Sequence, residues 1–158
     1  MARLLERCGP GIEQLSGTAG HITAIFTVLV EGDDHNEPVA DAARGVLDGH
    51  IVLDRKVAEA GRFPAIDVLR SLSRAAAACM SLNEIKLIRR CRQILSMHEM
   101  LTDLVRLGAY KQGFDKNADE AVVLAPQIEE FLRQESMGFV GSNDAFLLLQ
   151  AIVPDSQG

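Results

Sequence analysis

Aromatic residues and cysteines are scarce in this 158-residue sequence. It contains no tryptophan and a single tyrosine, and its three cysteines, Cys8, Cys79 and Cys91, form no C-x-x-C pair. An odd number of cysteines at this spacing argues against a disulfide framework and against a thiolate metal site. Unpaired thiols are typical of a reducing compartment, so we expect a cytoplasmic protein.

Long apolar runs are also lacking. The most apolar segment near the end, residues 146–153 (FLLLQAIV), is far shorter than the roughly 20 residues that cross a bilayer. The opening residues, MARLLERCGPG, lack the apolar core of a signal peptide. We therefore expect no membrane span, and any contact with a membrane would be peripheral, at the inner face of the cytoplasmic membrane.

Positive charge is in short supply, and lysine most of all. The net charge is −6, the sequence pI is about 5.2, and 12 of the 16 basic residues are arginine. This balance disfavours nucleic-acid binding through counterion release, so we expect no nucleic-acid partner. Arginine suits planar recognition of carboxylate or phosphate, so any phosphate contact should be local.

The first half of the sequence has the pattern of an α/β fold. Residues 21–31 are nearly continuous in apolar and β-branched side chains, as in a strand buried on both faces of a parallel sheet. A helix over residues 39–48, opened by Pro38, and a second strand over residues 50–53 would complete a β-α-β unit. Two strands alone do not make a stable sheet, so this part is predicted to be the end of a larger α/β domain.

Helical spacing dominates the second half. We expect a short helix over residues 55–60, an extended segment around Pro64 and a broken helix over residues 68–80. From residue 83 to 107, steps of three and four separate the apolar side chains, as on the buried stripe of one long helix. The stripe consists of Ile85, Ile88, Cys91, Leu95, His98, Leu101 and Val105.

Two further helices follow in the pattern. One covers residues 117–134 and should be broken or kinked by Pro126; the other begins at a cap on Ser142 and ends at residue 153. The predicted fold class is therefore α/β plus all-α, an incomplete parallel-sheet domain over residues 1–80 followed by a helical bundle over residues 81–158. A short helix over residues 2–8 precedes the first strand.

The glycine-bearing loop over residues 9–20 (GPGIEQLSGTAG) invites comparison with a phosphate-binding loop. A Walker A loop needs a lysine followed by serine or threonine, and the first lysine here is Lys56. We therefore interpret the loop as a connector, and expect no cradle for nucleotide phosphates in this chain.

An acidic cluster, Asp33, Asp34, His35 and Glu37, could be drawn as a metal site. It lacks paired or helical ligand spacing. Acidic residues before a helix also oppose the helix macrodipole favourably, which explains the cluster without an ion. We predict no metal site here.

Several stretches resemble the ATPases of the bacterial flagellar export apparatus and of type III secretion systems, which are similar in turn to the alpha and beta subunits of rotary ATP synthases. Residues 30–53 (VEGDDHNEPVADAARGVLDGHIVL) and 63–74 (FPAIDVLRSLSR) carry the resemblance most specifically. MARLLER resembles the helix after the family's Walker B strand, and residues 104–115 and 119–134 resemble its helical C-terminal domain. The resemblance covers nearly the whole chain.

The resemblance implies a role for individual residues. Arg74 matches the arginine finger, which acts in trans on the phosphoryl group held by a neighbouring subunit. Phe63 matches a position, usually tyrosine, that stacks on adenine, and a phenyl ring keeps the stacking face. Tyr110 matches the GAY segment, to which we assign packing alone. Without the resemblance, Arg74 would be an exposed helix arginine and Phe63 a core anchor.

The resemblance also implies ATP as the ligand and a homohexamer with full-length subunits. The Walker A loop, the Walker B aspartate and the glutamate that polarises water precede the matched region, so Mg²⁺ would be held by residues outside this chain, and the chain alone is expected not to hydrolyse ATP. Export chaperones, export substrates, and stalk and regulator proteins are the expected partners. The alternative is a non-catalytic helical interaction module that binds export chaperones or stalk proteins.

Overall fold

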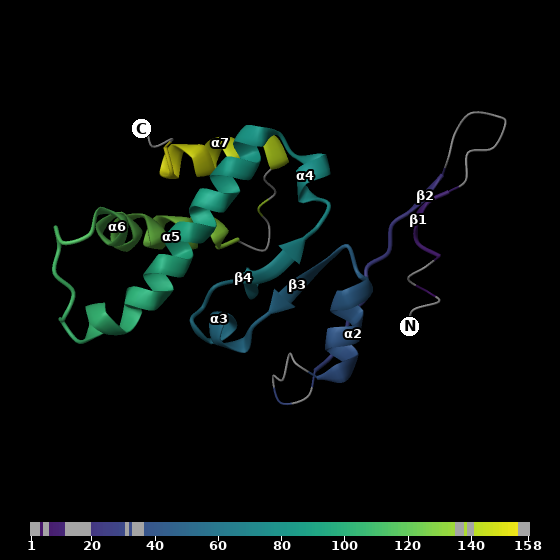
Figure 1. Cartoon of the computed structure of the whole chain (residues 1–158), viewed down its shortest axis with the longest axis horizontal. Helices are drawn as coiled ribbons and strands as arrows, with labels where there is room; N and C mark the ends of the chain where they lie inside the picture. The colour runs from purple at the N-terminus through teal and green to yellow at the C-terminus, as the bar shows by residue number, and fades with distance from the viewer. Residues whose placement is uncertain are drawn as a thin grey trace. The chain divides into compact units, whose positions relative to one another are not determined.

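The computed structural model describes residues 4, 7–11, 20–30, 32, 37–134, 138 and 141–154. By their contacts the residues separate into two compact units, residues 1–50 and 51–158. Figure 1 shows the helices and strands of both units. None of the helices in these described residues is long and apolar enough to cross a membrane.

The first unit contains a small antiparallel ladder. Strand β1 (Gly9–Pro10) pairs with β2 (His21–Ile22), with Gly9 opposite Ile22. The prediction of a strand over residues 21–31 is therefore wrong beyond its first two residues, since residues 23–30 form no strand and Ile25 is 94% exposed. A strand that is apolar on both faces is stable only between neighbouring strands and covering helices, and the described residues supply neither.

Helix α2 (Pro38–Val46) follows, with Pro38 in its first turn as predicted, and it ends two residues before the expected boundary. The backbone of Glu37 caps this helix, but its carboxylate makes no capping hydrogen bond. Most of the glycine-bearing loop (residues 12–19), the acidic residues Asp33, Asp34 and His35, and most of the helix predicted over residues 2–8 lie outside the described residues.

A two-stranded sheet follows α2 along the chain. It consists of β3 (Gly49–Leu53) and β4 (Ile66–Ser73), joined through helix α3 (Arg55–Glu59). The backbone N–H of Asp54 donates to the carbonyl of Ala65 at 2.9 Å, so the end of β3 lies beside the start of β4 and the strands run in opposite directions (Figure 1). The expected parallel β-α-β pairing of residues 21–31 with β3 does not form.

The helix predicted over residues 68–80 is also wrong, because residues 68–73 belong to β4. Only its end is helical, in α4 (Ala76–Cys79). Apolar side chains stand at every second position of this segment, at Ile66, Val68 and Leu72, and only Arg70 interrupts the series. This pattern is compatible with a strand, and the pairing with β3 decides between strand and helix. Pairing with β3 therefore overrides the local helix propensity of residues 68–73.

Three helices complete the second unit: α5 (Leu82–Arg106), α6 (Lys116–Leu132) and α7 (Ser142–Ile152). They confirm the predicted helical bundle. Helix α5 begins with a capping box, in which Glu84 N–H donates to Ser81 Oγ at 3.3 Å and Ser81 N–H donates to Glu84 Oε2 at 2.7 Å. Helix α6 continues through Pro126, and Gly141, rather than Ser142, is the N-cap of α7.

The core lies between these helices. The predicted stripe of α5 is rotated in part: Leu87 and Ile94 are buried, whereas Val105 is 41% exposed. Residues of α6 and Val153 complete the cluster, which comprises Leu87, Cys91, Ile94, Leu95, Ala121, Ala125, Ile128 and Val153. Burial raises the pKa of the Cys91 thiol to about 11, so this cysteine stays protonated and unreactive at neutral pH.

The turn between α5 and α6 is held by one carboxylate. Gly108, with a φ of +66°, closes α5. Asp119 Oδ1 then accepts a hydrogen bond from the Tyr110 hydroxyl, and both of its oxygens accept the Gly113 N–H, at 3.1 and 2.9 Å. The hydrogen bond to Asp119 is the largest cause that raises the pKa of Tyr110 to about 12, with smaller effects of desolvation and nearby carboxylates.

Titration of the single tyrosine tests this clamp. We expect phenolate absorbance to report a pKa of about 12 and to return toward 10 in Asp119→Asn. Because the folded-state pKa is raised, the stabilisation should be complete below about pH 10 and lost as the pH rises through about 12. The exposed Asp144→Asn is the matched control; equal tyrosine pKa values in both variants would contradict the clamp.

Candidate functional site

The loop before β4 carries Phe63. Its ring is 56% exposed, while the neighbouring Arg62 is 8% exposed. Arg62 Nε pairs with Glu129 Oε2 of α6 at 2.8 Å, and its Nη2 donates to the carbonyl of Ile66 at 3.0 Å. The carbonyl of Phe63 accepts the backbone N–H of Gln134 at 2.8 Å. The loop is therefore anchored to the helical bundle, and the aromatic ring is left accessible.

Arg74 lies at the other end of β4. It directly follows the last residue of the strand, Ser73, in a bend that leads into α4, and it is exposed. Phe63 precedes β4 and Arg74 follows it, so the fold does not bring the two predicted residues together.

Strand β4 departs from regular geometry just before Arg74. The Ser71 hydroxyl donates to the carbonyl of Asp67 at 2.5 Å. Residues four apart in an extended strand are about 13 Å apart, so the chain must turn between them. Asp67 Oδ1 also accepts the backbone N–H groups of Leu69 and Arg70, each at 2.9 Å. We call residues 67–71 the β4 bulge.

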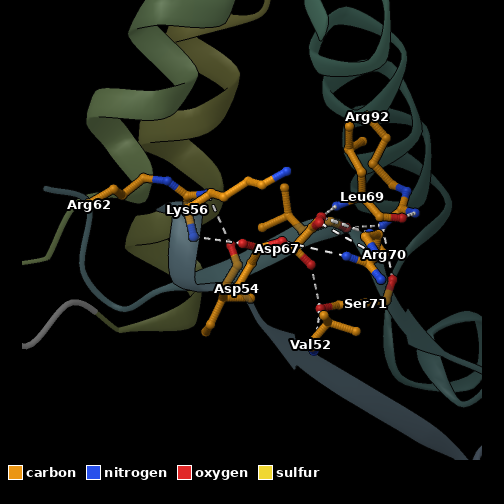
Figure 2. Close-up of polar contacts among 11 residues, drawn as sticks. Val52, Asp54, Lys56, Arg62, Asp67, Leu69, Arg70, Ser71 and Arg92 are labelled. Atoms are coloured by element: carbon orange, nitrogen blue, oxygen red, sulfur yellow. Dashed lines mark hydrogen bonds and ion pairs between the residues drawn. The ribbon is translucent and has the colours of Figure 1, made fainter. Parts of the chain in front are cut away.

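The β4 bulge is tied to the sheet and to the end of β3. Ser71 Oγ accepts the N–H of Val52 at 3.0 Å. Arg70 pairs with Asp54 at 3.5 Å and lies 3.9 Å from Asp67 (Figure 2). Asp54 in turn caps α3 by accepting the Lys56 N–H at 2.8 Å. A bulge re-aims the residues that follow it, and here these lead to Arg74.

Helix α5 also holds the bulge, through Arg92. Its guanidinium donates to the carbonyl oxygens of Leu69 at 2.6 Å, of Ser71 at 3.2 Å, and of Val68 (Figure 2). Three carbonyls on one guanidinium use the rigid fork of donors that arginine alone provides. An open cleft of about 970 Å³ lies beside it, lined in part by Leu72, Ser73, Ala76 and Met80.

Sequence reasoning missed the residues that hold these elements. Arg62, Asp67 and Arg92 were not singled out, although Asp67 two residues before Leu69 carries an Asx-turn signal. Arg92 lies on the polar face of a long amphipathic helix, where a solvated arginine is the ordinary expectation. Among the described residues, no group of three or more histidine, cysteine or acidic side chains could hold a metal ion.

Two sequence families match the chain, one after the other. Residues 1–73 match the ATP synthase alpha/beta family, nucleotide-binding domain, and residues 80–151 match the T3SS EscN ATPase C-terminal domain. The first match ends one residue before Arg74. Phe63 lies inside it, and Arg92 lies inside the second.

Curated relatives are similar over most of the chain. The flagellum-specific ATP synthase of Caulobacter vibrioides is 49% identical over 97% of this chain and 35% of its own length. The corresponding protein of Salmonella typhimurium is 45% identical over 96% of this chain and 32% of its own length. The SPI-2 type 3 secretion system ATPase of that organism is 47% identical over 85% and 30%. The chain spans about a third of the length of these relatives.

Solved structures are also similar to this chain over most of its length. The assembled ATPase EscN from the enteropathogenic E. coli type III secretion system has a TM-score of 0.87 at 34% identity, and the match covers 96% of this chain and 35% of EscN. EscN in complex with its central stalk EscO has a TM-score of 0.80 at 33% identity, covering 94% and 34%.

Proposed function

The chain belongs to the flagellar and type III secretion ATPase family, and from this we propose that it is the C-terminal part of an ATP-hydrolysing protein-export ATPase. The observation that carries the proposal is the placement of Arg74. An exposed arginine follows a strand whose course is set by hydrogen bonds from both the sheet and α5. A residue that must reach into another subunit's site needs such a rigid base.

The proposed division places residues 1–80 in the RecA-like nucleotide domain and residues 81–158 in the helical C-terminal domain. Ser81 supports the boundary, because its capping box begins α5. Two arginines connect the parts across this boundary. Arg92 of the helical part bonds the β4 bulge, and Arg62 of the nucleotide part pairs with Glu129 of α6.

In the proposed mechanism, Arg74 acts in trans as the arginine finger. Negative charge on the oxygens of the transferring phosphoryl group is stabilised by its guanidinium. Phe63 offers one face of its ring to adenine, through stacking that does not depend on a hydroxyl. Mg²⁺ would neutralise phosphate charge when it is bound by residues outside this chain.

The proposed partners follow from the relatives. EscN is described as an assembled ATPase and in complex with a central stalk, and we propose a homohexamer and a stalk partner for the protein containing this chain. Export chaperones, their substrates and regulator proteins are further proposed partners. The proposed location is the cytoplasm, at the inner face of the cytoplasmic membrane during export.

A chimera tests the function directly. Its matching segment would be removed from the Caulobacter vibrioides relative and replaced by this whole chain, which is 49% identical to it; we call this protein the export chimera. We expect it to hydrolyse ATP at a rate within about tenfold of the parent, while this chain alone releases no phosphate above background. A folded, assembled chimera without hydrolysis would contradict the proposal.

Phe63 can be examined in the export chimera. We expect Phe63→Ala to raise the KM for ATP by about 5- to 150-fold with a smaller change in kcat, since one aromatic stacking contact contributes about 1–3 kcal/mol. Phe63→Tyr should keep the parental KM because it keeps the stacking face. Steady-state phosphate release distinguishes them; an unchanged KM in Phe63→Ala would remove Phe63 from the nucleotide site.

A further inference from the structure

We propose that Arg92 is a positioning residue that sets the aim of Arg74: by holding three carbonyls of the β4 bulge from helix α5, it fixes where the end of β4 points. The inference rests on the proposed role of Arg74. Arg92, a residue of the helical part, thereby positions a residue of the nucleotide part.

The first support is the number and kind of contacts. The two terminal nitrogens of Arg92 donate to the carbonyl oxygens of Leu69 and Ser71 at 2.6 and 3.2 Å, and also to that of Val68. Hydrogen bonds from an ionised donor are stronger than neutral ones. All three acceptors are backbone atoms, so the contacts constrain the path of the chain itself.

The second support is the geometry of the segment they hold. The Ser71 hydroxyl bonds the Asp67 carbonyl at 2.5 Å, and Asp67 Oδ1 bonds the N–H groups of Leu69 and Arg70. These bonds are internal to β4, so they can shape the bulge but cannot orient it. Val52 orients it from the sheet. Arg92 orients it from the helices.

The third support is the short distance along the chain to Arg74. Only Leu72 and Ser73 separate the last held carbonyl, on Ser71, from Arg74. A change of backbone direction at Ser71 therefore changes the position from which the side chain of Arg74 projects. Displacement of a catalytic group by about 1 Å can cost about 100-fold in rate.

Two substitutions distinguish a positioning role of Arg92 from an effect of its positive charge. Arg92→Lys keeps a positive charge but lacks the planar fork, so it cannot hold three carbonyls in the same geometry. Arg89→Lys makes the same chemical change at an exposed position on the same helix and is the matched control. In the export chimera we expect Arg92→Lys to lower kcat by about 10- to 100-fold with an unchanged KM for ATP, and Arg89→Lys to leave both unchanged.

A double variant distinguishes positioning from a general structural role. If Arg92 acts through Arg74, Arg92→Lys should have no further effect on kcat in a chimera that already carries Arg74→Ala. A structural defect would instead multiply the two losses. Multiplied losses, or equal kcat values for Arg92→Lys and Arg89→Lys, would overturn the proposal. If Arg74→Ala itself has no effect, the proposed role of Arg74 fails first.

Amide hydrogen exchange on the chain itself gives an independent readout. Arg92→Lys should speed exchange in residues 69–74 by about tenfold or more while the protection of α6 is unchanged. Arg89→Lys should leave both segments as they are. A uniform increase across β4 and α6 would indicate loss of global stability and would overturn the positioning role.

Discussion

Replacing Arg74 with alanine in the export chimera is expected to lower kcat by about 10³- to 10⁵-fold, the range found for arginine fingers in phosphoryl transfer. The reason is electrostatic: the guanidinium of Arg74 would stabilise the charge that develops on the phosphoryl group held by the neighbouring subunit. The KM for ATP should change little, because the contact forms in the transition state. The exposed Arg133, which pairs only loosely with Glu130 at 3.6 Å, provides Arg133→Ala as the control.

Mixing experiments test whether Arg74 acts in trans. A chimera with Arg74→Ala and a second chimera whose Walker A lysine is replaced should each be inactive alone. Mixed in one ring, some interfaces combine an intact phosphate site with an intact Arg74, so hydrolysis should return in part. Failure to recover hydrolysis in rings shown to be mixed would mean that Arg74 serves its own subunit.

The second large effect concerns stability. Ile128 is 2% exposed and lies in the α5–α6–Val153 core. We expect Ile128→Ala to lower the free energy of unfolding by about 2–5 kcal/mol, because the apolar contacts are lost and a cavity remains. Urea unfolding followed by the helical circular dichroism signal measures this change.

The control for Ile128 lies on the same helix. Val123 is 57% exposed, so Val123→Ala should change the free energy of unfolding by about 0.5 kcal/mol or less. Equal losses at the two positions would show that α6 does not pack as described. The comparison also keeps helix propensity nearly constant, since both variants place alanine in α6.

The helices of the bundle and strand β3 could be predicted closely, whereas β2 and β4 could not. Helix α5 begins and ends within one residue of expectation because its apolar spacing, its Ser81 cap and Gly108 all act within a few residues. Residues 21–31 look like a strand, yet of the described residues 21–30 only His21 and Ile22 pair. A strand needs partners far away in sequence, and no local pattern states whether they are present.

The candidate site divides in the same way. Arg74 and Phe63 were predicted through a resemblance carried by short contiguous motifs. The residues that hold them, Arg62, Asp67 and Arg92, form contacts that a pattern along the chain does not reveal. Arg62 pairs with Glu129, 67 residues further along the chain. Arg92 donates to the carbonyl of Val68, 24 residues before it.

By itself, the sequence determined the three helices of the bundle and the family resemblance, because hydrophobic period, capping and contiguous motifs are local properties. Only the tertiary structure decided that residues 66–73 form a strand, that this strand bulges, and that an arginine of α5 holds the bulge beside Arg74. These outcomes depend on pairing with β3 and on carbonyls whose directions exist only once the chain has folded.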